Sequence, residues 1–465
     1  MAAQELSPSD RSSLAAERAP INMAVGGLLT FEPEPALTRA MVATRLAERI
    51  HLVPRLRQRL EETPLGIANP VWTDDTAFDL DWHVRQASLP PPGSDAELGA
   101  FVGREFSHRL DRSRPLWEAT LIEGMQDGRK GLLMKVHHAL VDGMAALGMA
   151  ALVLDPSEQP LEIPPPDETW TPRRYDIRRH LARLATRPLA RAPRLMLEGL
   201  ARTLDPDPRR AAADMRRASE LVVELARARP QAPMTPLNHP ISPNRRYTVA
   251  RTDLATIKGV GHRAGGTVND VLLAVVAGML GRYLAAAGPE SVDVDGPPVV
   301  ALVPVSVRGS DEGELGNRIS TVFVDLPVHE HNLLARIAAI TAQTRELKES
   351  AAVRAGALMV GAAGWAPPLV SGVVARAMGT VRACNLVVSN VPGPQQPFYL
   401  NGVRMDSVYP IVPLNPANQG LSVGIVSYDG AVSFGVLADR DLDPPLSTAA
   451  AGLIASLGEL RGALP

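Results

Sequence analysis

The stretch GLLMKVHHALVDG, residues 131–143, decides how this chain is interpreted. Its first six residues, 131–136, are mostly apolar and predict a short buried strand. The residues at 144–154 are rich in Ala and Leu and predict a helix. His137 and His138 are therefore expected between a strand and a helix, where α/β enzymes tend to place reactive groups. A packed histidine pair in the core is the plainer alternative, and the HHxxxDG spacing favours a reactive site.

The histidine pair supplies the chemistry expected here, because an imidazole can take a proton from an alcohol near neutral pH. We expect one of the two rings to face a cavity and the other to pack inward. Asp142 follows His138 by four residues, so one helical turn would bring both to the same face. Asp142 could orient the ring, pair with an arginine or cap the helix. Gly143 allows close backbone approach or a positive φ.

A zinc site and a covalent serine nucleophile fit this sequence less well than a direct transfer without a covalent enzyme intermediate. Adjacent histidines rarely converge on one zinc ion, and no HExxH segment occurs among the ten histidines. A GxSxG segment, which nucleophilic serine catalysis on a strand-turn-helix needs, is not found. The sequence therefore predicts no metal, and a transfer with His138 as base and no covalent enzyme intermediate.

The composition indicates a globular protein with at least two cores. A chain of 465 residues is too long for one compact core. Its formal net charge of −2 gives the whole molecule no polyanion-binding character. The single cysteine, Cys384, excludes a disulfide framework and favours a reducing compartment. The first twenty residues lack the apolar run of a signal peptide, so export is not expected.

We expect three segments along the chain, with boundaries at 1–160, 161–243 and 244–465. The first and third alternate helix and strand signals, and the second is a helical crossover bounded by prolines. Residues 170–230 hold 15 Arg against 7 Asp and Glu, a local charge of +8 that leaves −10 for the rest. Such basic helices either lie solvated on the surface or bind anionic lipid headgroups. Nucleic acid is not expected, because the interleaving of aromatic with basic residues that base stacking needs is missing.

Periodicity and turn signals predict the individual elements. Extended segments are expected at 22–31, 78–84, 117–122, 131–136, 245–250, 298–305, 320–326, 386–389, 421–428 and 431–438. Helices are expected at 36–49, 95–110, 254–263 and 332–348, and after Thr267 as a cap. Asp429-Gly430 predicts a type I′ hairpin turn. Two apolar stretches are not expected to span a membrane: 268–284 suits a buried amphipathic helix, and 358–374 contains Pro367-Pro368 and suits a buried or interfacial segment.

Nine short segments carry a resemblance to a known family. They are LSPSD (6–10), PLW (115–117), HHALVDG (137–143), TPLN (235–238), NDVLLA (269–274), VPVSVR (303–308), LGNR (315–318), NVPGP (390–394) and SYDG (427–430). HHxxxDG alone marks the wider superfamily of chloramphenicol-acetyltransferase-like enzymes, and the ordered set is more specific. Over nearly its full length the chain resembles the bacterial bifunctional wax ester synthase/diacylglycerol acyltransferases.

The resemblance implies an α/β fold of two chloramphenicol-acetyltransferase-like domains, joined by a long helical crossover, with a tunnel at their interface. Acyl-CoA would be the co-substrate, a diacylglycerol or long-chain alcohol the acceptor, and no cofactor would be needed. His138 would be the general base, with support from neighbouring motif residues. The supporting residues would be His137, Asp142, Gly143, Asn269 and Asp270, and the tunnel-lining candidates Arg308 and Asn317. For Asn269 and Asp270, structural and active-site roles both stay open.

Two departures from the family pattern leave the acceptor open. Met23-Ala24 stands where many relatives have a histidine after the methionine, and Ser12-Ser13 where they often have an aromatic residue. An acyltransferase using another acceptor or a carrier-protein thioester is one alternative function. A catalytically weak lipid-binding paralogue is another. The expected location is the cytoplasm, peripherally on the inner membrane face or on lipid droplets.

Overall fold

The computed structural model describes nine ranges of the chain: 4–62, 70–140, 152–166, 170–176, 232–288, 298–307, 318–349, 382–414 and 418–463. Several sequence expectations lie outside these ranges. They are Asp142, Gly143, Arg308, Asn317, most of the helix expected at 144–154, most of the crossover at 161–243, and the apolar segment at 358–374.

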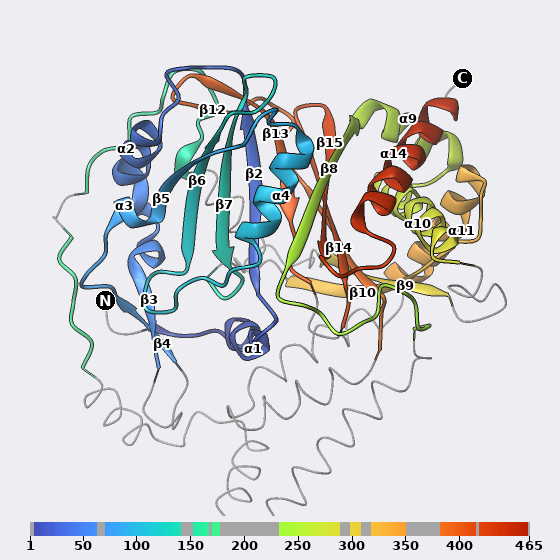
Figure 1. Cartoon of the computed structure of the whole chain (residues 1–465), viewed down its shortest axis with the longest axis horizontal. Coiled ribbons are helices and arrows are strands. Elements are labelled where there is room, and N and C mark those ends of the chain that lie inside the picture. The colour runs from blue at the N-terminus through green and yellow to red at the C-terminus, as the bar shows by residue number, and fades with distance from the viewer. Residues whose placement is uncertain are drawn as a thin grey trace, which may run out of the picture.

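The first half of the chain alternates strands and helices as expected of an α/β protein (Figure 1). Its elements are β1 (Gln4–Glu5), α1 (Pro8–Ala16), β2 (Ala24–Phe31), α2 (Arg39–Arg49), the 3-10 turns η1 (Ile50–Leu52) and η2 (Pro54–Arg57), β3 (Gln58–Glu61), β4 (Val71–Asp74), α3 (Leu80–His83), β5 (Val84–Ser88), α4 (Asp95–Glu105), β6 (Trp117–Glu123) and β7 (Lys130–His137).

The second half repeats this alternation with longer helices. Its elements are β8 (Arg245–Asp253), α9 (Leu254–Ala264), α10 (Val268–Ala286), β9 (Val299–Val307), β10 (Arg318–Leu326), α11 (Leu333–Glu349), β11 (Leu386–Pro392), β12 (Tyr399–Leu400), β13 (Val403–Ile411), β14 (Leu421–Tyr428), β15 (Ala431–Asp439) and α14 (Leu446–Gly462).

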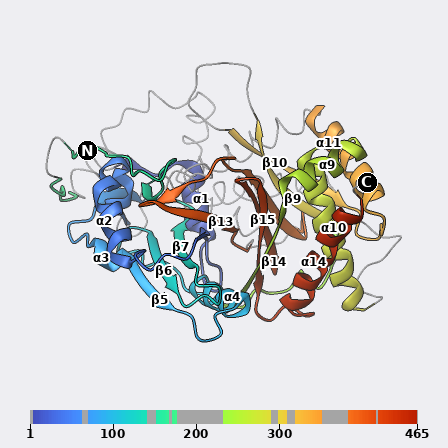
Figure 2. The same cartoon turned by 90° about the horizontal axis from the view of Figure 1, so that it is seen from above.

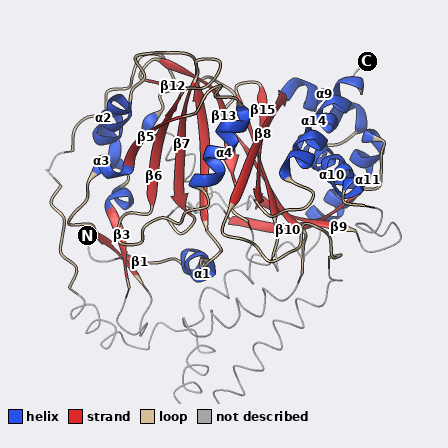
Figure 3. Ribbon diagram, viewed as in Figure 1, coloured by secondary structure: helices blue, strands red, loops and turns tan. Residues whose placement is uncertain are grey.

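Two mixed six-stranded sheets form the centre of the molecule (Figure 3). Their strand orders are β12-β13-β2-β7-β6-β5 and β10-β9-β11-β14-β15-β8. Most neighbours are antiparallel, but β5 runs parallel to β6, and β11 runs parallel to β9 and β14. Helices α2 and α3 lie beside the first sheet, and α9, α10, α11 and α14 cluster beside the second, as the view from above also shows (Figure 2). Each six-stranded sheet, together with the helices beside it, thus forms an α/β unit.

The first sheet is completed by strands from the second half of the chain. β13 pairs antiparallel with β2, and Ile411 lies opposite Gly26. The same strand crosses the second sheet where Gly424 and Gly435 face each other in the β14–β15 register. A Cβ atom on Gly435 would lie 2.0 Å from the carbonyl oxygen of Pro410, so this close crossing requires glycine. The segment boundaries at 1–160, 161–243 and 244–465 stay predictions. Residues 399–411 belong to the third of these segments, but their strands lie in the sheet of the first.

Most expected elements are confirmed within a few residues, and two need correction. Residues 78–84 were expected to be extended, but Asp79 accepts a hydrogen bond from the Asp81 amide and begins a short helix, so that the strand starts at Val84. The helix expected at 95–110 ends at Glu105. Lys135 Nζ donates to the Glu105 carbonyl (2.8 Å), a tertiary contact that stabilises this end of the helix.

α10 is the core helix of the second half. Thr267 caps it as expected, in a capping box with Asp270. Every residue from Asp270 to Leu280 is buried, so the helix is buried on all sides rather than amphipathic. Within the described ranges it is the one helix long and apolar enough to cross a membrane, but 72% of its apolar window is buried inside the protein. That burial is typical of a core helix.

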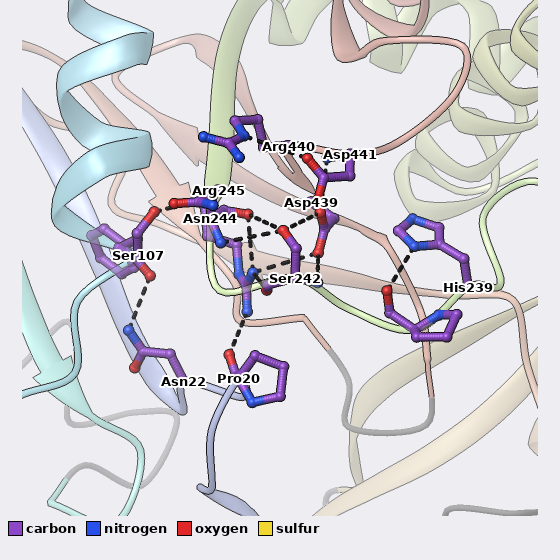
Figure 4. A network of polar contacts seen from close by, with 12 residues as sticks. Pro20, Asn22, Ser107, His239, Ser242, Asn244, Arg245, Asp439, Arg440 and Asp441 are labelled. Atoms are coloured by element: carbon purple, nitrogen blue, oxygen red, sulfur yellow. Dashed lines mark hydrogen bonds and ion pairs between the residues drawn. The ribbon is translucent and has the colours of Figure 1, made fainter.

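A polar network joins the two halves near the start of β8 (Figure 4). The buried Arg245 guanidinium donates to the carbonyls of Pro20 (3.1 Å) and Asn244 (3.0 Å), and its Nη1 lies 3.6 Å from Asp439 Oδ2. The Arg245 amide donates to Ser107 Oγ (2.8 Å), at the end of α4. The Arg245 side chain therefore contacts the loop before β2, and the Arg245 backbone amide contacts Ser107 just after α4. These contacts fix the two halves against each other.

Candidate active site

The histidine pair lies at the end of β7, where strands from both sides hold its backbone. His137 pairs with Ala24 of β2, and its amide donates to the Leu116 carbonyl (2.9 Å) just before β6. The His138 amide donates to the Met23 carbonyl (2.9 Å). Both amides are thus fixed by neighbouring segments, and β7 ends toward α1 (Figure 1).

The two rings differ in exposure, and the expectation that one of them faces a cavity stays a prediction. His137 is fully buried (0% exposed), whereas His138 is partly exposed. His137 Nδ1 accepts a hydrogen bond from the Ala139 amide (3.0 Å). A neutral His137 therefore carries its proton on Nε2. The accessible ring of the pair is that of His138.

Glu17 faces the buried ring. Its Oε1 lies 3.4 Å from His137 Nε2, and both side chains are 1% exposed. Nε2 has no hydrogen-bond partner among the described residues, so this contact is electrostatic at the observed geometry. Burial alone raises the pKa of Glu17, but His137, the Met23 amide and Arg112 outweigh it and lower the pKa to about 2. Glu17 is therefore an ionised carboxylate next to the buried ring of His137.

Ser13 faces the partly exposed ring. Its Oγ lies 3.4 Å from Nδ1 of His138, within a long hydrogen bond. Ser13 belongs to α1, which begins with a capping box between Ser7 and Asp10 and with Pro8 at its first position. The LSPSD segment thus forms the start of a helix whose far end lies against both histidines.

The PLW segment forms the structural support on the other side of β7. Trp117 is fully buried, its Nε1 donates to the Leu56 carbonyl (2.8 Å), and its ring stacks on His83 at 4.5 Å. Burial lowers the pKa of His83 to about 4, so His83 is neutral at pH 7. The Trp117 indole is thus a packing anchor of the first sheet.

Asn269 and Asp270 serve the second half of the molecule. Asp270 is 1% exposed; its Oδ2 accepts from the Thr267 amide (2.8 Å), and its Oδ1 accepts from Thr344 Oγ1 (2.8 Å). Asn269 Oδ1 accepts from Asn390 Nδ2 (3.2 Å), which brings the NDV and NVPGP segments together. Asp270 thus completes the capping box of Thr267 at the start of α10 and also contacts Thr344 of α11, a structural role.

The structure brings together His137 and His138 and adds two residues that the sequence analysis did not assign to the site. These are Ser13 and Glu17, which are separated from the pair by more than one hundred positions. A local signal existed, since Ser7-Pro8 with Asp10 is a helix-start pattern and would have placed residues 13 and 17 on one face. Asp142, Gly143, Arg308 and Asn317 stay predictions, because they lie outside the described ranges.

The arrangement suits proton transfer at one imidazole. A partly exposed ring with a fixed backbone and a polar group at Nδ1 can exchange a proton at Nε2 with a substrate. Within the described residues, no group of three His, Cys, Asp or Glu side chains is placed to hold a metal ion.

Comparison with protein families gives two matches. Residues 6–272 match the model of the wax ester synthase/diacylglycerol acyltransferase catalytic domain, and residues 315–461 match the C-terminal domain of the same family. The first match contains the histidine pair and α1, and the second contains β11, β13, β14 and β15.

Individual relatives agree with these matches over the full length. A candidate diacylglycerol O-acyltransferase of Mycobacterium bovis is 31% identical over 468 residues, covering 98% of each chain. One of Mycobacterium tuberculosis is 32% identical and covers 99% of this chain and all of its own. The solved wax ester synthase/diacylglycerol acyltransferase of Marinobacter aquaeolei VT8 has a TM-score of 0.70 at 28% identity, covering 98% of both chains.

More distant structures share the fold alone. A starter condensation domain of rhizomide synthetase has a TM-score of 0.55 at 14% identity, covering 98% of this chain and 93% of its own. The arrangement of two mixed α/β sheets is therefore common to acyltransferase and condensation domains.

Proposed function

Because this chain belongs to the wax ester synthase/diacylglycerol acyltransferase family and is an acyltransferase of that type, we propose that it transfers a long-chain acyl group from acyl-CoA to diacylglycerol, to a long-chain alcohol, or to both. The products would be triacylglycerol or wax ester. Full-length similarity to candidate diacylglycerol O-acyltransferases supports the diacylglycerol acceptor, and the Marinobacter structure supports the alcohol.

One observation carries the mechanism: of the two adjacent histidines, His138 is the partly exposed one and His137 is fully buried. A general base must reach the proton that it removes, so the exposed ring is the one able to act. The backbone contacts of His138 to Met23 and of His137 to Leu116 hold that ring in one place.

The reaction balances with one base and no enzyme-bound intermediate. His138 Nε2 takes the proton of the acceptor hydroxyl as its oxygen attacks the thioester carbonyl carbon. The new C–O bond forms, the C–S bond breaks, and the coenzyme A thiolate takes the proton back from the imidazolium. Ester and free coenzyme A leave, and the imidazole is neutral again.

Turnover with defined lipids tests this proposal. Purified protein would receive palmitoyl-CoA with diacylglycerol, and separately with hexadecanol, while the free thiol and the ester are measured. We expect ester from at least one acceptor and a roughly 10²–10⁴-fold lower kcat in His138→Ala, the contribution of general-base catalysis. His262→Ala removes an exposed histidine on α9 and should retain full activity.

Three results would contradict the proposal. Equal turnover by His138→Ala would exclude this base. Acyl transfer to a carrier-protein thiol but to no lipid alcohol would replace the acceptor. Binding of acyl-CoA and lipid without turnover under any of these conditions would indicate a lipid-binding protein.

We also propose that the enzyme works in the cytoplasm, at an anionic membrane or lipid-droplet surface. The proposed acceptors, diacylglycerol and long-chain alcohols, are water-insoluble, and residues 170–230 carry a local charge of +8. Binding to vesicles of phosphatidylglycerol should weaken as salt rises, and replacing arginines in this segment by glutamine should abolish it. Binding that survives these replacements, or is insensitive to salt, would reject this role for the segment.

A further inference from the structure

α1 presents two polar groups to the histidine pair. Ser13 and Glu17 are four residues apart, one turn of helix, and they face adjacent residues of β7 and its following turn. Ser13 Oγ meets Nδ1 of His138 at 3.4 Å, and Glu17 Oε1 meets Nε2 of His137 at 3.4 Å. Accepting the proposed function, we infer that Ser13 is a positioning residue that fixes the tautomer of His138.

The helix that carries Ser13 is held firmly at both ends. Its start is closed by the reciprocal hydrogen bonds of Ser7 and Asp10. At its end, Arg112 donates to the Leu14 carbonyl (3.3 Å) and to Glu17 Oε2 (3.1 Å). Leu14 is buried in the core of the first half. The position of Ser13 Oγ is therefore set by packing and capping, which is what a group that orients a catalytic ring requires.

The tautomer follows from the donors and acceptors of the two groups. A neutral imidazole carries one proton, and a serine hydroxyl can both donate and accept. When Nδ1–H of His138 donates to Ser13 Oγ, the lone pair lies on Nε2, the nitrogen that takes a proton in the proposed reaction. Within a helix, a serine hydroxyl can donate its own proton to the carbonyl four residues earlier, which leaves its lone pairs for Nδ1. Catalytic hydrogen bonds are commonly long without substrate and shorten in the reactive complex.

The opposite tautomer is found next to it. His137 accepts from the Ala139 amide at Nδ1 and so carries its proton on Nε2, toward Glu17. One helix face thus offers a hydroxyl to the reactive ring and a carboxylate to the structural ring. We expect each group to suit its own histidine and not the other.

Three variants test the role of Ser13. Ser13→Ala removes the acceptor, Ser13→Thr keeps a hydroxyl, and Ser12→Ala changes an exposed neighbour on the same helix. We expect kcat to fall about tenfold in Ser13→Ala, the effect of one lost hydrogen bond, with KM for palmitoyl-CoA nearly unchanged. Ser13→Thr should recover most of kcat, and Ser12→Ala should match the parent protein.

A measurement without turnover separates this inference from the proposed function. Nitrogen-15 NMR of histidine-labelled protein reports which ring nitrogen carries the proton, and His138→Gln identifies the signal. We expect Nδ1–H in the parent and in Ser13→Thr, and a shift toward Nε2–H in Ser13→Ala. If the parent shows Nδ1–H but makes no ester, the inference holds and the proposed function fails.

Two results would overturn the inference. An unchanged tautomer and kcat in Ser13→Ala would show that Ser13 has no positioning role. An acyl adduct on the peptide carrying Ser13, formed from palmitoyl-CoA without acceptor, would make Ser13 a nucleophile instead.

Discussion

At the scale of single residues, the two adjacent histidines differ because their surroundings differ. His137 and His138 are neighbours, yet one is enclosed by β2, β6 and Glu17 while the other is partly exposed beside Ser13. The Ala139 amide donates to Nδ1 of His137, and the ionised Glu17 carboxylate faces Nε2 of the same ring. The pair therefore divides into a buried ring and a partly exposed ring.

The Glu17 carboxylate makes a pH-dependent contribution to stability. Its pKa is 4.5 in the unfolded chain and about 2 in the folded protein, a difference worth on the order of 3 kcal/mol. Since the folded value is the lower one, this stabilisation is complete above pH 4.5 and is lost as the pH falls toward 2. We expect Glu17→Gln to have a lower urea midpoint than the parent protein at pH 7. The difference between the two midpoints should narrow at about pH 3.5.

Glu62→Gln is the matched control for that experiment. Glu62 also lies near Arg112 (3.7 Å), but its side chain is 70% exposed. We expect no measurable change in the urea midpoint, because exposed ion pairs contribute little. A gap between Glu17→Gln and the parent that is the same at both pH values would contradict the assignment of the ionised carboxylate.

At the scale of elements, strand β2 determines where the histidines lie. It pairs with β7 on one side and with β13 on the other, so any shift in β2 moves the end of β7. The apolar pattern at 22–31 predicted this strand, but not its second partner. β13 was not predicted, although Asn401-Gly402 directly before it is a hairpin signal with both φ angles positive. Its partner β2 lies almost four hundred positions earlier, and no local pattern specifies that pairing.

Two adjacent glycines in β2 provide an element-scale test. A Cβ on Gly26 would lie 2.3 Å from the Met134 carbonyl oxygen, whereas one on Gly27 would meet nothing closer than 3.9 Å. We expect Gly26→Ala to destabilise the protein by roughly 1–3 kcal/mol, and to lower kcat, because β2 and β7 must separate. Gly27→Ala should change the thermal midpoint only slightly. Equal midpoints for the two variants would show that β2 tolerates the displacement.

At the scale of the whole molecule, the two α/β halves are joined by more than the chain that connects them. β13 completes the first sheet and crosses the second at Gly424 and Gly435, and Arg245 joins the loop before β2 to Asp439 (Figure 4). The halves should therefore unfold together rather than one at a time.

Arg245 tests this connection. Arg245→Met leaves Asp439, which is 1% exposed, without its buried cation, and removing one partner of such a pair costs roughly 3 kcal/mol. We expect a clearly lower urea midpoint, followed by fluorescence and circular dichroism. Arg246→Met, at the exposed neighbouring position, should leave the midpoint unchanged. Identical midpoints for the two variants would refute a stabilising role for the network.

The sequence by itself determined most helices and strands and the family, and it pointed to the histidine pair as the candidate site. These follow from local information: periodicity, caps such as Thr267, the Asp429-Gly430 turn with both φ angles positive, and ordered short motifs. Only the tertiary structure decided which histidine is accessible, that Ser13 and Glu17 face the pair, and that β13 joins the first sheet. Those contacts join residues more than one hundred positions apart, and no local pattern specifies them, because packing of the whole chain selects the partners.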